Sequence, residues 1–137
     1  MITIHTIRPH VRDFAPVLFS YIKLYKITRL NDVVHFPPTS KEYLSVVVIN
    51  GNLTDLEQYF AKKLSRTTGH KIKFELSDAL AVVLYLQLLH YPLHKDHFYF
   101  QSIRNNWIQL LDRALIQAAI ISKTTYTPAR TTEEEYE

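Results

Sequence analysis

The sequence predicts a mostly helical fold of about five helices, with at most a short two-stranded β-ribbon. Apolar residues recur at intervals of three and four along most of the chain, which is the period of amphipathic helices. Only two short segments alternate instead, and only two of the 137 residues are glycine. A chain of this length that is 47% hydrophobic can bury one core. We therefore expect a single helical domain over residues 1–121 and a polar tail over residues 122–137.

Residues 2–7 and 71–76 carry the alternating pattern that predicts strands. In the second segment, Ile72, Phe74 and Leu76 alternate with charged side chains. A lone strand leaves its backbone groups unpaired, so the two segments are expected to pair with each other.

The first helix is predicted over residues 14–30. Asp13 can accept hydrogen bonds from the first turn, and Pro16 then lies where a missing N–H costs little. Aromatic and aliphatic residues follow at helical spacing, with lysine and arginine on the opposite side.

Two further helices are predicted over residues 40–49 and 54–66. In each, a threonine at the start is followed three residues later by a glutamate, which fits a capping box. Asn50-Gly51 supplies the left-handed stop expected after the first of them. The β-branched run 46–49 opposes this interpretation, because such side chains favour strands.

The last two helices are predicted over residues 78–91 and 97–121. In the first of them, Gln87 and His90 are the only residues between 79 and 91 that are not apolar, so we expect this helix to be buried on all sides. Pro92 ends it. The final helix is apolar over more than half of its circumference. Packing against a single core would require a narrower apolar face.

The composition excludes several kinds of chemistry. Without cysteine there is no thiol catalysis, disulfide or cysteine-ligated metal, and two glycines cannot form a glycine-rich phosphate loop. No local nucleophile signature is present. His90, His94 and His97 are weak metal candidates, but Pro92 interrupts the helix that would align them. We predict a protein that is not an enzyme, with no cofactor and no bound metal.

The excess apolar surface of the last helix predicts a protein–protein interface. The expected partner is a protein, in a homo-oligomer or a larger assembly; a small structural component of a phage or another multi-protein machine fits this description. No secretory or membrane-spanning pattern is found, so a cytoplasmic location, or the virion of a phage, is expected. The predicted interface residues are Phe98, Tyr99, Trp107, Ile108, Leu115, Ile116, Tyr126 and Tyr136.

An alternative function is nucleic-acid binding. Residues 40–49 and 54–66, with the turn between them, have the outline of a helix-turn-helix whose second helix is basic. A solvated basic helix end is the competing interpretation, because the helix dipole favours cations there. The residues that would face nucleic acid are Lys62, Lys63, Arg66, Lys71 and Lys73.

The charges are unevenly distributed along the chain. Residues 1–132 hold all sixteen lysines and arginines and nine of the thirteen acidic residues, whereas the last five residues hold the other four. The formal net charge of +3 therefore conceals a basic body and an acidic tip. Such a tip suits a tail that docks on a neighbouring copy.

Overall fold

The computed structural model describes residues 1–92 and 97–121, and all structural statements below concern this part of the chain. The mostly helical class is confirmed, with four helices in place of about five. Their order is β1 (Ile2–Ile7), α1 (Arg8–Asp32), α2 (Lys41–Arg66), β2 (Lys71–Leu76), α3 (Asp78–His90) and α4 (Phe98–Gln117). None of these helices is both long and apolar enough to cross a membrane.

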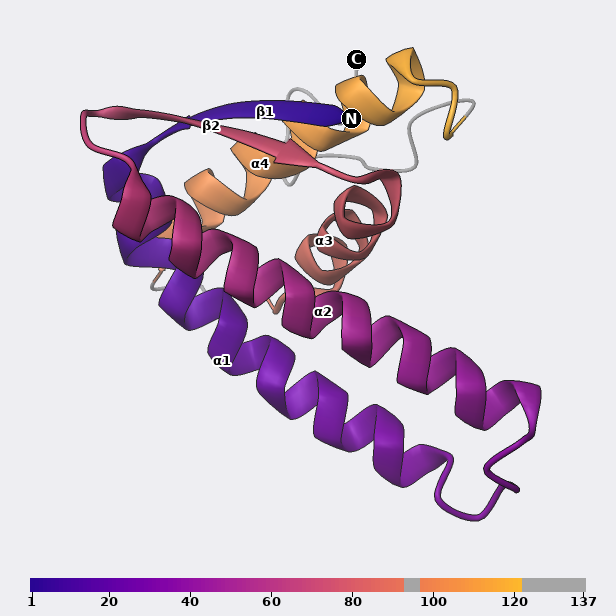
Figure 1. The fold of residues 1–137 in the computed structure, drawn as a ribbon. Helices are drawn as coiled ribbons and strands as arrows, with labels where there is room; N and C mark the ends of the chain where they lie inside the picture. The colour runs from indigo at the N-terminus through magenta and orange to yellow at the C-terminus, as the bar shows by residue number, and fades with distance from the viewer. Residues whose placement is uncertain (93–96, 122–137) are drawn as a thin grey trace, which may run out of the picture.

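The helices α1 and α2 form a long antiparallel hairpin that projects well beyond the rest of the molecule (Figure 1). The ribbon, α3 and α4 pack around the other end of this hairpin. We call that packed end the body. The buried core lies in the body, where aromatic rings from four elements meet. Phe14 contacts Tyr91 and Trp107 at ring distances of 5.4 and 5.3 Å, and Phe60 stacks on Phe74 at 4.4 Å.

The ribbon forms where the alternating pattern predicts it. β1 and β2 pair antiparallel, from Ile2 opposite Leu76 to Ile7 opposite Lys71. The even-numbered residues of both strands face the core, and the odd-numbered ones face outward. Thr6 is the one polar residue on the inner face, and its hydroxyl accepts a hydrogen bond of 3.1 Å from the indole N–H of Trp107.

The break predicted between residues 49 and 54 is wrong, because α2 runs through it without interruption. Several of the polar groups that suggested a break form hydrogen bonds inside the hairpin, although the Asn50 side-chain oxygen is buried without a partner among the described residues. The Asn50 amide donates to the Lys26 carbonyl at 3.2 Å, and the Thr54 hydroxyl donates to the Asn50 carbonyl at 3.0 Å. A helical glycine costs only about 1 kcal/mol relative to alanine. Burial of Leu53 and Leu56 just beyond Gly51 outweighs that cost.

Three other helix ends differ from the prediction. α1 begins at Arg8, because Pro9 supplies the first-turn proline and Pro16 is accommodated inside the helix. α2 is capped by Ser40, whose hydroxyl accepts from the N–H of Tyr43 at 3.2 Å. α4 ends at Gln117, because Ala119 takes a left-handed conformation with φ 58°.

The end of α3 is held by side chains from two neighbouring helices. Arg104 of α4, only 6% exposed, donates from Nε to the Leu88 carbonyl at 2.7 Å and from Nη2 to the Leu89 carbonyl at 3.2 Å. The Tyr21 hydroxyl of α1 donates to the His90 carbonyl at 3.0 Å. The Leu88 carbonyl also accepts from the Tyr91 N–H at 3.3 Å, and the side-chain bonds supply donors to the last carbonyls of α3, where the helix itself offers few. The expectation that this helix is buried on all sides fails at Leu86, which is exposed.

Candidate protein-interaction surface

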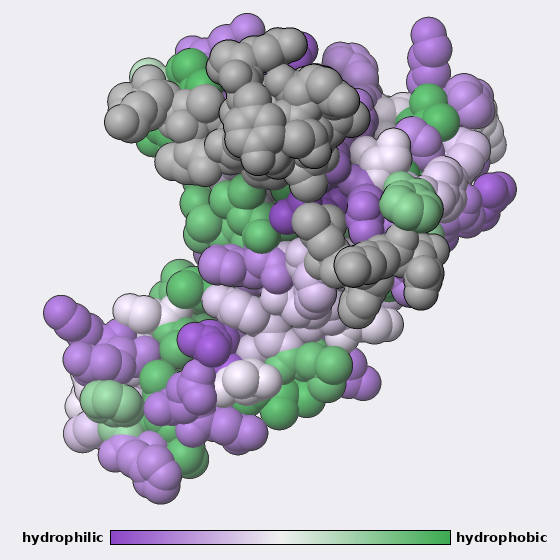
Figure 2. All heavy atoms as spheres, turned by 180° about the vertical axis from the view of Figure 1, so that it is seen from behind, coloured by the Kyte–Doolittle hydropathy of each residue, from purple (hydrophilic) through white to green (hydrophobic). Residues whose placement is uncertain are grey.

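The projecting half of the α1–α2 hairpin carries most of the exposed large apolar side chains of the described residues. Figure 2 shows hydrophobic residues at the surface of this projection, interspersed with hydrophilic ones. Nine of the fourteen such side chains in the described part of the chain lie between residues 24 and 49. We call these nine the hairpin surface: Leu24, Ile27, Leu30, Val34, Phe36, Leu44, Val47, Val48 and Ile49.

The hairpin surface exists because the body covers only one end of the hairpin. Ile22 is the last buried residue of α1, and Leu53 is the first buried residue of α2. Between them, over residues 23–52, Val33 is the only buried residue. Two helices alone can shield only the strip where they touch each other, so the remaining apolar side chains face outward.

Two hollows mark the hairpin surface. One, of about 470 Å³, lies along α2 and is lined by Leu44, Val48 and Ile49 with Lys41 and Ser45. The other, of about 300 Å³, lies between the two helices and includes Ile27, Leu30 and Gly51. A Cβ added at Gly51 would meet no atom within 4 Å, so this glycine leaves open space on the surface. Both hollows have the apolar character of sites that receive side chains from a binding partner.

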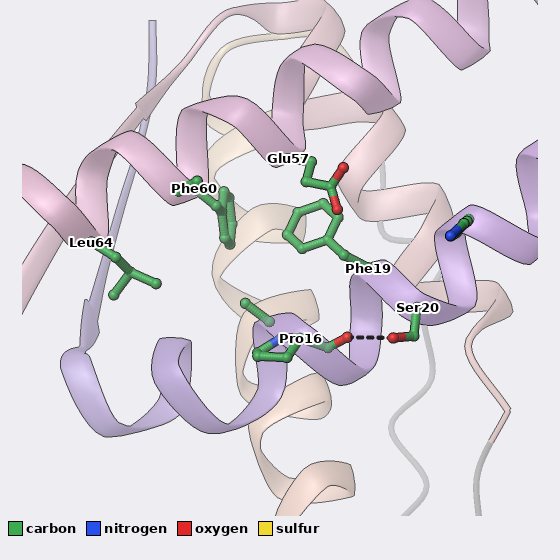
Figure 3. A pocket seen from close by; sticks show the side chains of 9 residues that line it. Pro16, Phe19, Ser20, Glu57, Phe60 and Leu64 are labelled. Carbon is green, nitrogen blue, oxygen red and sulfur yellow. Dashed lines mark hydrogen bonds between the residues drawn. The ribbon is translucent and has the colours of Figure 1, made fainter.

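A third hollow, of about 280 Å³, lies between α1 and α2 nearer to the body (Figure 3). The rings of Phe19 and Phe60 converge in it with their centroids 5.4 Å apart. The Ser20 hydroxyl donates to the Pro16 carbonyl at 2.9 Å and is thus occupied. Glu57 is the single carboxylate of this lining, so the hollow offers an apolar surface for recognition and no pair of acidic groups for acid–base chemistry.

The charged side chains around the hairpin surface are mostly basic. Residues 23–52 contain four basic residues, Lys23, Lys26, Arg29 and Lys41, and two acidic ones, Asp32 and Glu42. Arg29 pairs with Asp32 at 3.2 Å and lies over the ring of Tyr25 at 5.5 Å. Lys26 donates to the Thr54 hydroxyl at 3.0 Å and so helps to join the two helices. A complementary partner would carry acidic groups around an apolar centre.

The interface predicted on the last helix is only partly at the surface. Trp107, Ile108 and Leu115 are buried in the core, because α4 packs against β1, α3 and α1 at once and uses its apolar breadth internally. Phe98, Tyr99 and Ile116 are exposed, at 75%, 48% and 37%. Tyr126 and Tyr136 lie outside the described residues.

Tyr99 takes part in a small polar cluster with α1. Its hydroxyl donates to Asp13 at 2.8 Å, and Arg12 donates to the same carboxylate at 3.0 Å. The hydrogen bond from Arg12, followed by the one from Tyr99, lowers the pKa of Asp13. Asp13 thus lies inside α1 as an ion-pair partner. The sequence predicted instead that Asp13 caps the start of this helix.

The predicted helix-turn-helix is wrong, since the two helices are one. The five basic residues proposed for nucleic acid nevertheless lie at one end, on the last turns of α2 and the outer face of β2. There Lys73 pairs with Glu75 at 2.9 Å. This pairing is the main cause that lowers the pKa of Glu75, with a smaller contribution from Lys63. A carboxylate among these cations weakens their attraction for phosphate.

The weak metal candidates are not brought together in the described residues. His90 ends α3, and the ring of His97 packs edge-on against Phe100 at 5.6 Å. His94 lies outside the described residues. Within residues 1–92 and 97–121, no three histidine or acidic side chains form a group that could hold a metal ion.

No family model, curated protein or solved structure matches this chain. Sequence reasoning missed the hairpin surface, although one signal could have found it. Val46–Ile49 is an apolar run within α2, and Val33, Val34 and Phe36 lie in the turn that follows α1, so the sequence itself places apolar side chains at the end of the hairpin that is far from the body. The nine exposed side chains thus define a candidate protein-binding site on geometry alone.

Proposed function

We propose that this protein is a non-enzymatic assembly subunit that binds a protein partner through the hairpin surface. One observation carries the proposal: over residues 23–52 a single residue is buried, while nine large apolar side chains are exposed. So many exposed large apolar side chains on one projection favour an interaction site, because monomeric proteins rarely expose extensive apolar surface.

The shape of the surface favours a helical partner. An exposed pair of antiparallel helices is half of a helical bundle, and further helices can bury their apolar sides against it. The basic side chains around it favour a partner with acidic groups at the rim of the contact. A small structural component of a phage or of another multi-protein machine would use such a projection to join its neighbours.

The test begins with co-purification from the native source and identification of the protein that accompanies the chain. The purified partner is then titrated with the wild type and with Val48→Lys, which places a charge where a 62% exposed valine stands. The matched control is Gln58→Lys, on the exposed side of α2 but outside the hairpin surface. We expect Val48→Lys to weaken binding about 30-fold, the effect of losing a central interface contact, and Gln58→Lys to leave it unchanged. Equal affinities of all three chains would contradict the proposal.

Nucleic-acid binding remains a second candidate, because five cations gather at the end of α2 and on β2. Its signature is affinity that falls steeply as salt is raised. Titration of a random-sequence duplex at low and moderate salt tests it. Loss of binding in the triple change Lys62→Glu, Lys63→Glu and Arg66→Glu would support this function, and unchanged affinity in that variant would exclude it.

A further inference from the structure

The two strands of the ribbon have different outer edges. The Arg8 N–H donates to the His70 carbonyl at 2.6 Å, whereas the Glu75 N–H donates away from β1, to the Tyr59 hydroxyl at 2.8 Å. Opposed residues in an antiparallel pair alternate between bonded and non-bonded positions. The backbone groups of the even-numbered residues therefore join β1 to β2. Those of Thr3, His5 and Ile7 point toward the opposite edge of β1.

The outer edge of β2 carries charged residues and one hydrogen bond to α2, whereas within the described residues the outer edge of β1 has neither. Tyr59 of α2 accepts the one outward N–H of β2 for which a bond is found. For the outward groups of Thr3 and His5 and the outward N–H of Ile7, no hydrogen-bond partner occurs among the described residues, whereas the Ile7 carbonyl lies at the N-cap of α1. β1 also lacks the devices that protect edge strands, since its sequence ITIHTI contains no lysine, no acidic residue and no proline. It is an uncharged, β-branched strand with an available backbone.

We propose that the open edge of β1 pairs with β1 of a second copy of this chain, antiparallel and about a two-fold axis at His5. This register places Thr3 opposite Ile7 of the second copy and pairs the outward groups of His5 in both strands with each other. Even-numbered residues stay on the inner face, so the core side of the ribbon continues across the junction. The result is a four-stranded sheet, and sheets of this size are more stable than a two-stranded ribbon.

A second copy fits this edge better than an unrelated strand. The strand carries no charged side chain, so pairing with itself brings no ionic repulsion. The proposed pairing is isologous and uses the β1 edge of both chains, so no β1 edge is left for a third copy and assembly stops at two chains. This dimer does not depend on the hairpin surface, which lies at the far end of the molecule and stays available to the partner proposed above (Figure 1).

A single introduced cysteine tests the register, because the chain contains none of its own. In the proposed dimer the two copies of residue 5 oppose each other with Cα atoms about 5.5 Å apart, within the range that a disulfide spans. We expect His5→Cys to oxidise to a species of twice the 16.1 kDa chain mass on a non-reducing gel. The control is Lys73→Cys, the position paired with His5 on the other strand, which should stay a single chain. Equal cross-linking of the two variants, or none in His5→Cys, would overturn the proposal.

Light scattering tests the pairing without cross-linking. We expect the wild type to have twice the chain mass, and His5→Pro to have the chain mass, because proline removes an outward N–H and leaves the bonds to β2 intact. Thr3→Lys, which adds charge to the edge, is the second variant in case the first does not fold. Circular dichroism confirms that the compared chains are folded. A wild-type chain that is monomeric at its highest soluble concentration would overturn the proposal, as would a dimer that survives both changes.

Discussion

The guanidinium of Arg104, buried in α4, donates a hydrogen bond of 2.7 Å to the carbonyl of Leu88 in α3. A second bond reaches the Leu89 carbonyl, so a positive charge lies at the end of α3 where the helix dipole is negative. This contact joins the two helices of the body that are connected through residues outside the described ranges.

Replacement of this arginine tests how much the contact contributes. We expect Arg104→Met to lower the free energy of unfolding by about 3 kcal/mol, because it leaves the two carbonyls without their charged donor. Urea denaturation measures this. Arg113→Met, an exposed arginine on the same helix, should change stability by less than about 0.5 kcal/mol. If the two variants were equally stable, the capping role of Arg104 would be wrong.

The continuity of α2 can be tested at Gly51. Because this glycine is helical and a Cβ there has free space, Gly51→Ala should stabilise the protein by about 0.5 to 1 kcal/mol. Gly69→Ala is the matched opposite case, since Gly69 has φ 97° and alanine would be strained. It should destabilise by about 1 kcal/mol. Destabilisation by Gly51→Ala would instead indicate the left-handed turn that the sequence suggested.

Because α2 is buried at one end and exposed at the other, replacing leucine by alanine should lower the free energy of unfolding by different amounts at its two ends. Leu53 is fully buried, so Leu53→Ala should cost about 3 kcal/mol in the free energy of unfolding. Leu44 is 48% exposed, so Leu44→Ala should cost less than about 1 kcal/mol in the isolated protein. Thermal and urea unfolding give both values. A large cost at Leu44 would show that the projecting half of the hairpin is packed in the free chain.

Acid should destabilise the fold through Asp13 and Glu75. Hydrogen bonds from Arg12 and Tyr99 lower the pKa of Asp13, and the bond from Lys73 lowers that of Glu75. A carboxyl whose folded pKa is depressed contributes stability above its unfolded pKa of about 4, and this contribution is lost as the pH falls through the folded pKa. Melting temperatures measured from pH 7 to pH 3 should therefore fall less for Asp13→Asn with Glu75→Gln than for the wild type. Parallel curves would contradict the assignment.

The ribbon and most helix positions could be predicted, because alternation and helical periodicity are local properties. Residues 2–7 and 71–76 have the predicted bounds, and the antiparallel pairing followed from the need of each strand for a partner. The start of α3 was also predicted from its N-cap, Ser77, whose hydroxyl accepts from the Leu80 N–H at 3.3 Å.

The continuity of α2 could not be predicted from local signals. Thr54 and Asn50 are common at helix ends, yet here their side chains bond within the helix and across to α1. Tertiary contacts decided between the two uses of the same groups. The burial of Trp107 has a similar cause, because the sequence of one helix does not reveal how many neighbours surround it.

The hairpin surface is the central claim, and amide hydrogen exchange with and without the purified partner tests it most directly. The backbone of residues 41–49 should exchange more slowly in the complex, because a bound partner shields it and suppresses local opening. Residues 62–66, on the same helix but at the other end, should exchange at the same rate in both samples. Protection confined to residues 62–66, with no change at 41–49, would contradict the proposed role of the hairpin.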